Sequence, residues 1–74
     1  MKHETILSAI RGGVEDSLGV NEADRQMKEW EESGKLDELV KESREYLAKT
    51  NQDDPESLMV VLRDFAQDVV PMRL

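Results

Sequence analysis

The chain has 74 residues, of which 38% are hydrophobic and 36% are charged, and its formal net charge at pH 7 is −7. This length supports one small domain over residues 1–74 and excludes a second domain or a deep substrate cleft. Because the chain has no cysteine, disulfide frameworks, thiolate metal sites and cysteine nucleophiles are also excluded. Seventeen acidic against ten basic residues argue against direct nucleic-acid binding, which depends on cations that displace counterions from phosphates.

No segment has the pattern of a leader or a membrane span. The residues after Met1 are interrupted by polar and charged side chains, without the apolar stretch of a signal peptide. The longest apolar run, Leu58 to Leu62, has five residues, whereas a transmembrane helix needs about 20. We therefore expect a soluble, cytoplasmic protein without membrane contact.

The first predicted helix covers residues 4–18. Its apolar side chains fall within an arc of about 120° at helical spacing; they are Ile6, Leu7, Ile10, Val14 and Leu18. Gly12 and Gly13 interrupt this pattern, and each costs about 1 kcal/mol relative to alanine inside a helix. The pair predicts a break or kink. The alternative is that a bulky ring such as Trp30 packs on the bare backbone.

Residues 22–32 form the second predicted helix. Gly19 is placed for a positive φ that ends the first helix, with Val20 packing back on Val14, and Asn21 is the expected N-cap of the second. Only three residues make its apolar face: Ala23, Met27 and Trp30. This predicts a surface helix that is anchored by one aromatic side chain.

The third and fourth predicted helices cover residues 35–50 and 55–69. Asp54 is the expected N-cap of the fourth, Pro55 suits its first position, and Pro71 is expected to stop it. Its apolar residues span an arc of about 180°, broader than one packing face needs. The fourth helix is therefore predicted to be either central or shared with a second copy. With short connections, the prediction is an all-α bundle of three to four short antiparallel helices.

Acidic side chains form rows on the second and third helices: Glu22, Glu29 and Glu32 on one, and Glu38, Glu42 and Glu45 on the other. The second row lies within about 60° of arc, on the side opposite the apolar stripe. Such a row can bind a basic groove, including one that normally holds nucleic acid. The other interpretation is a solvated face with ordinary i,i+4 ion pairs such as Asp37–Lys41.

The sequence predicts no catalytic residue, cofactor site or metal site. His3 is a lone terminal histidine without converging ligands, and residues 51–56 lack the ligand spacing of a calcium loop. A helix-turn-helix near Gly34 would direct Glu38 and Glu42 toward phosphates, which repulsion disfavours. We therefore expect a protein that is not an enzyme.

Asp16-Ser17-Leu18 resembles the attachment site of acyl carrier proteins, which are small, acidic, four-helix domains. The resemblance implies that Ser17 carries a phosphopantetheine. In that family, however, the serine opens the second helix, whereas Ser17 falls in the last predicted turn of the first. A carrier or small-ligand domain is therefore an alternative hypothesis.

The leading hypothesis is a small interaction protein that binds and blocks a protein partner with a basic surface. Small, acidic, cysteine-free helical proteins are familiar among phage and mobile-element inhibitors, including nucleic-acid mimics and anti-CRISPR proteins, and the likeness is one of composition. A structural helical dimer is a further alternative. The predicted homodimer seam on the fourth helix consists of Met59, Val60 and Val70.

Overall fold

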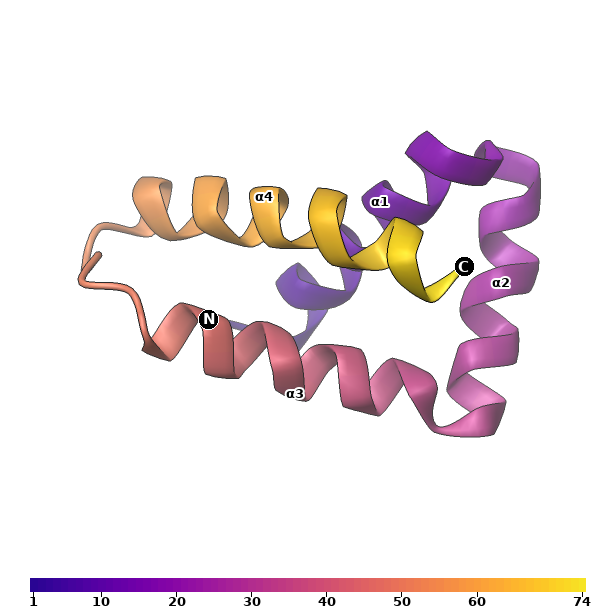
Figure 1. Cartoon of the computed structure of the whole chain (residues 1–74), viewed down its shortest axis with the longest axis horizontal. Helices are drawn as coiled ribbons and strands as arrows, with labels where there is room; N and C mark the ends of the chain where they lie inside the picture. Colours follow the sequence, from indigo (N-terminus) through magenta and orange to yellow (C-terminus); the bar gives the residue numbers. More distant parts are fainter.

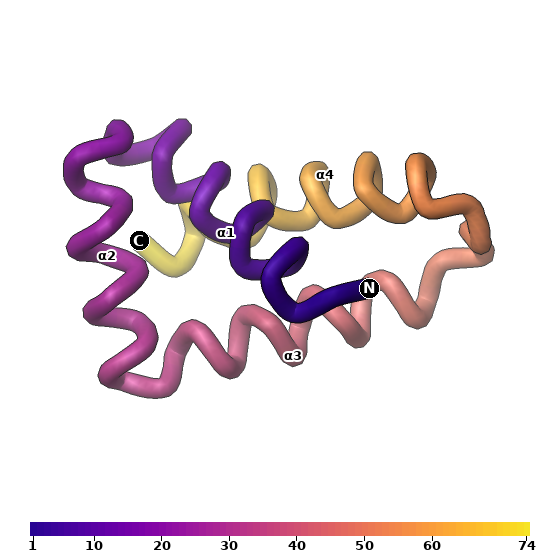
Figure 2. The backbone as a smooth tube through the Cα atoms, turned by 180° about the vertical axis from the view of Figure 1, so that it is seen from behind, coloured from indigo at the N-terminus to yellow at the C-terminus, as the bar shows by residue number.

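The computed structural model describes residues 1–74 and contains four helices and no strand. These are α1 (His3–Leu18), α2 (Val20–Ser33), α3 (Lys35–Ala48) and α4 (Pro55–Arg73). α3 and α4 run antiparallel, and α2 lies across one end of the pair (Figure 1). Seen from the other side, α1 crosses in front of that pair (Figure 2). The structure confirms the all-α bundle, with α2 set crosswise.

α1 and α3 each contact the other three helices, and the apolar stripe of α1 forms the centre of the core. Ile6, Ile10 and Val14, spaced by four residues, are fully buried, as are Leu62 and Val70 of α4. Rows of this spacing form the ridges by which helices pack together. The core therefore lies between α1 and the α3–α4 pair, and it leaves the other side of that pair uncovered.

α1 runs without interruption through Gly12 and Gly13, so the predicted break is wrong. Gly13 is buried, and a Cβ atom there would lie 3.0 Å from the carbonyl oxygen of Ala66 and 3.1 Å from Cβ of Val70. The alternative of packing on bare backbone holds at Gly13, although the contact comes from α4 and not from Trp30. Gly13 lets two helices approach closely.

The junction between α1 and α2 is shorter than the sequence predicts. Gly19 has the expected positive φ of 89°, but α2 begins at Val20 and Gly19 occupies the N-cap position. Its carbonyl oxygen accepts a hydrogen bond from the backbone N–H of Ala23. Asn21 is therefore inside the first turn and is not the cap. Val20 is 61% exposed, so most of its side chain faces solvent.

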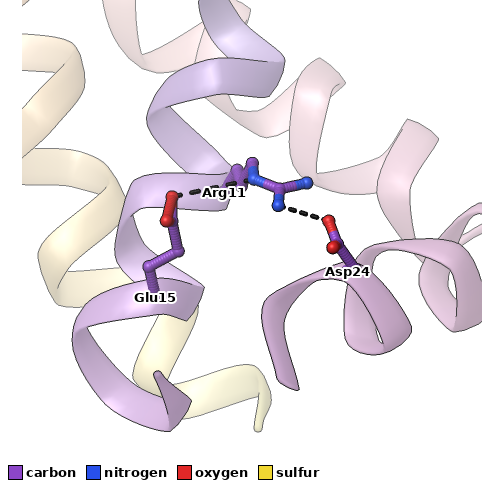
Figure 3. Close-up of polar contacts among 3 residues, drawn as sticks. All are labelled: Arg11, Glu15 and Asp24. Atoms are coloured by element: carbon purple, nitrogen blue, oxygen red, sulfur yellow. Dashed lines mark hydrogen bonds and ion pairs between the residues drawn. The ribbon is translucent and has the colours of Figure 1, made fainter. Parts of the chain in front are cut away.

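Arg11 supplies the polar contact across this junction (Figure 3). Its guanidinium pairs with Asp24 of α2 and, at 3.7 Å from Nε to Oε1, with Glu15 of its own helix. Because these groups are exposed or half-exposed, the pairs add little to the free energy of unfolding. Their main consequence is that Asp24 is not free to meet another cation.

α4 begins as predicted and ends later. The Asp54 side chain accepts a hydrogen bond from the backbone N–H of Ser57 at 3.2 Å, which confirms the cap. The helix then continues through Pro71 to Arg73, four residues beyond the predicted end. Proline at this place removes one backbone hydrogen bond, close to the end where the last carbonyl groups lack helical partners anyway. α3, in contrast, ends at Ala48, two residues before the predicted end.

Candidate functional site

The six acidic residues of the predicted binding face have different environments. Glu22 pairs with Arg25, and Glu42 pairs with Arg73, each at 2.7 Å between nitrogen and carboxylate oxygen. The remaining four are exposed and take part in none of the ion pairs of the structure: Glu29, Glu32, Glu38 and Glu45. These four carboxylates are available to a partner.

Glu42 does not face away from the molecule as the helical wheel predicts. Its side chain is 37% exposed and reaches Arg73 in the last turn of α4. Its second oxygen, Oε2, is buried and has no hydrogen-bond partner in the protein. The row on α3 is therefore not a continuous exposed acidic face, because the side chain of its middle member, Glu42, contacts α4.

Free carboxylates gather instead where α2 turns into α3. We define the acidic corner as five exposed residues around Gly34, none of them in an ion pair: Glu29, Glu31, Glu32, Asp37 and Glu38. Since the rise of a helix is about 1.5 Å per residue, each lies within about 8 Å of the turn along its helix axis. Lys35 is the one basic residue within this stretch, so the corner carries a strong local negative charge.

Two members of the acidic corner occupy unfavourable positions for the helix that carries them. Glu31 and Glu32 lie in the last turn of α2, which contains no basic residue. Carboxylates at this end face the negative pole of the helix dipole, and a charge near a helix end changes stability by about 0.3–1 kcal/mol. Asp37 and Glu38 occupy the first turn of α3, where the same dipole favours them. The helix dipole therefore disfavours part of the acidic corner.

A groove opens between α3 and α4 beside the acidic corner. One hollow, of about 240 Å³, is lined by Glu42, Glu45, Tyr46, Lys49, Phe65, Val69 and Arg73. A second, of about 170 Å³, is lined by Trp30, Lys35, Glu38, Leu39 and Arg73. Arg73 borders both hollows, and together we call them the α3/α4 groove. Sequence reasoning missed this feature because the predicted fourth helix ended before Arg73.

An aromatic pair forms the apolar wall of the larger hollow. The rings of Tyr46 and Phe65 are 5.0 Å apart between centroids and inclined at 39°. Such tilted pairs are favourable arrangements of aromatic rings. Phe65 is 8% exposed whereas Tyr46 is 45% exposed, so the pair presents one accessible ring in the groove.

The predicted apolar seam on α4 is only partly at the surface. Val70 is fully buried under Gly13 of α1, so its assignment to an interface is wrong. Met59 is half-buried and Val60 is 58% exposed. The wide apolar arc of α4 is explained by its two neighbours, since α1 and α3 both pack on it.

The homodimer through α4 stays a prediction, now with Met59 and Val60 as its seam. Light scattering from micromolar to millimolar concentration should show a species of twice 8.5 kDa, because the exposed Val60 and the half-buried Met59 gain from further burial in a dimer. Val60→Asp should give the monomer mass, whereas Val20→Asp, equally exposed on α2, should leave the dimer unchanged. A monomer at every concentration in the unsubstituted protein would exclude the dimer.

The structure offers few residues for other kinds of functional site. No group of three or more His, Cys, Asp or Glu side chains is placed to hold a metal ion. Ser17 is exposed in the last turn of α1, the position expected from the sequence. None of the helices combines the length and apolar character that crossing a membrane requires. Protein-family models, curated proteins and solved structures gave no match to the chain.

Proposed function

We propose that this protein is a non-enzymatic interaction protein that binds a basic surface of a protein partner and thereby blocks it. The observation that carries the proposal is the acidic corner, with five exposed carboxylates and no ion pair. Two of them, Glu31 and Glu32, lie where the helix dipole disfavours a negative charge. A role in binding a partner accounts for acidic residues at positions where they do not stabilise the fold.

The overall charge supports the same function. With a net charge of −7 on 74 residues, the protein has a negative field that accelerates its encounter with a cationic surface. Within this class, the likeness in composition to phage and mobile-element inhibitors leads us to propose a partner that normally holds nucleic acid. We also propose a cytoplasmic location, again on composition.

Reversing two charges in the acidic corner separates binding from stability. In the variant Glu31→Lys/Glu32→Lys, we expect the free energy of unfolding to rise by about 1 kcal/mol, because positive charges near the C-terminal end of a helix stabilise it. Binding to the partner should weaken at least tenfold, mainly through slower association. The partner is recovered by capture at low salt from a lysate of the encoding organism, and affinity is then measured by surface plasmon resonance over a salt series.

The matched control is Asp64→Lys/Asp68→Lys on α4. Both residues are exposed and unpaired, and the net charge changes from −7 to −3 in both variants, since each reversal adds two units. The control should retain affinity within about threefold, the residual change reflecting long-range steering. Equal affinities for the two variants, or a capture that salt does not weaken, would refute a function of the acidic corner.

A further inference from the structure

The α3/α4 groove is divided by a residue of its own chain. Arg73 borders both hollows, and its Nη2 atom lies 2.7 Å from Oε1 of Glu42. The apolar floor and walls on either side include Trp30 and Leu39 in one hollow and Phe65 and Val69 in the other. The rest of the lining is charged, with Glu42, Glu45 and Lys49 in the larger hollow and Lys35 and Glu38 in the smaller. The groove thus accommodates a guanidinium between two hollows that each combine apolar and charged side chains.

The turn that carries Arg73 is weakly held. Pro71 lies inside it and has no N–H to donate to the preceding turn. Val70 is the last buried residue, and beyond it Met72 is 82% and Leu74 46% exposed. The pair with Glu42 is the one side-chain hydrogen bond or ion pair of these last residues. The turn can therefore release Arg73 while the core remains intact.

Arg73 pairs with only one of the carboxylate oxygens that α3 places near it. A guanidinium has five N–H donors and can bind both oxygens of a carboxylate at once. Arg73 contacts Oε1 of Glu42, whereas Oε2 is buried and unpaired. Glu38 and Glu45, about one turn away on either side, are exposed and unpaired. An arginine in the place of Arg73 would therefore meet an incompletely paired carboxylate on Glu42, with two further carboxylates about one turn away.

We propose that the α3/α4 groove binds a protein segment in which an arginine is flanked by apolar side chains. The arginine takes the place of Arg73 on Glu42, and the apolar side chains enter the hollows beside Trp30 and beside the Tyr46–Phe65 pair. The inference rests on the proposed function and adds the chemistry of the recognised segment. Glu38 belongs both to the acidic corner and to the groove, so the two surfaces are continuous.

The test uses a synthetic nine-residue peptide with one central arginine, a leucine on each side of it, and glycine and serine elsewhere. The peptide carries a fluorescein label, and the fluorescence anisotropy of this label measures the affinity of the peptide for the protein. The emission of Trp30, the one tryptophan of the chain, reports entry into the smaller hollow. A second peptide carries citrulline, which has the shape of arginine without its charge. We expect the arginine peptide to bind at least tenfold more tightly than the citrulline peptide.

Variants of the chain locate the site. Arg73→Gln removes the internal competitor and should strengthen peptide binding about two- to fivefold, the range expected for one half-exposed ion pair. Glu42→Gln should weaken binding about tenfold and abolish the preference over citrulline. The control Arg63→Gln removes an exposed, unpaired arginine from the same helix and should change affinity less than twofold, although its net charge equals that of Arg73→Gln.

Some results would overturn the proposal. These are equal binding of arginine and citrulline peptides, equal effects of Arg73→Gln and Arg63→Gln, or no binding to either the unsubstituted protein or Arg73→Gln. They leave the proposed function standing if the captured partner still responds to the Glu31 and Glu32 reversals. If that partner is insensitive to the reversals while the peptide binds as expected, the acidic corner is refuted and the groove is retained.

Discussion

Replacing Trp30 with alanine is expected to lower the free energy of unfolding by about 3–5 kcal/mol, the range for removing a large aromatic side chain from a core. Trp30 is 3% exposed. It and Ala23 are the buried residues of α2, and α2 contacts α1 and α3 but not α4. The tryptophan is therefore the largest buried side chain by which α2 is held on the bundle.

The effect is large relative to the whole domain. At about 0.05–0.15 kcal/mol per residue, a chain of this size has a total stability of about 4–11 kcal/mol. Urea denaturation followed by circular dichroism measures the loss, and hydrogen exchange should show early opening of α2. The control Val20→Ala changes a 61% exposed residue of the same helix and should alter stability by less than about 0.5 kcal/mol. A loss below about 1 kcal/mol for Trp30→Ala would show that α2 is held by other contacts.

Alanine substitutions at the two adjacent glycines of α1 are expected to have opposite effects. At Gly13 the new Cβ would meet the carbonyl oxygen of Ala66 at 3.0 Å and Cβ of Val70 at 3.1 Å. Because one of these neighbours is backbone, α1 and α4 must move apart. Overpacking of this kind costs about 1–3 kcal/mol, against a gain of about 1 kcal/mol in helix propensity. We expect Gly13→Ala to lower the free energy of unfolding by up to about 2 kcal/mol.

Gly12 provides the matched control. Nothing lies within 4 Å of a Cβ atom at this position, so Gly12→Ala keeps only the gain in propensity and should stabilise the protein by about 1 kcal/mol. Thermal and urea denaturation of both variants under identical conditions measure the difference. If both substitutions stabilise, the close approach of α1 and α4 at Gly13 is wrong.

The sequence alone determined the features that depend on neighbouring residues. The helical segments follow from the spacing of apolar side chains, although the prediction left their number at three to four, and the ends of α1 and α2 coincide with Gly19 and Gly34, both with positive φ. The cap at Asp54 and the role of Trp30 as the buried anchor of α2 were also predicted correctly. Each of these acts within three or four residues, so its physical cause is present in the local sequence.

Features that depend on distant segments were decided by the tertiary structure. Two adjacent glycines are compatible with a kink or with close packing, and the position of α4 decides for packing at Gly13. The interface assignment of Val70 failed for the same reason, because α1 covers it.

The candidate site shows the same limit. A helical wheel places Glu42 opposite the core stripe of its own helix, but it contains no second helix. Arg73, 31 residues away, reaches Glu42 only because α4 continues past Pro71 and lies antiparallel to α3. The charge and the helical periodicity of the sequence predict which side chains of a helix point away from the protein core. Whether they meet solvent or another helix is decided by the packing of the whole bundle, since that packing brings residues distant in sequence within the reach of an ion pair.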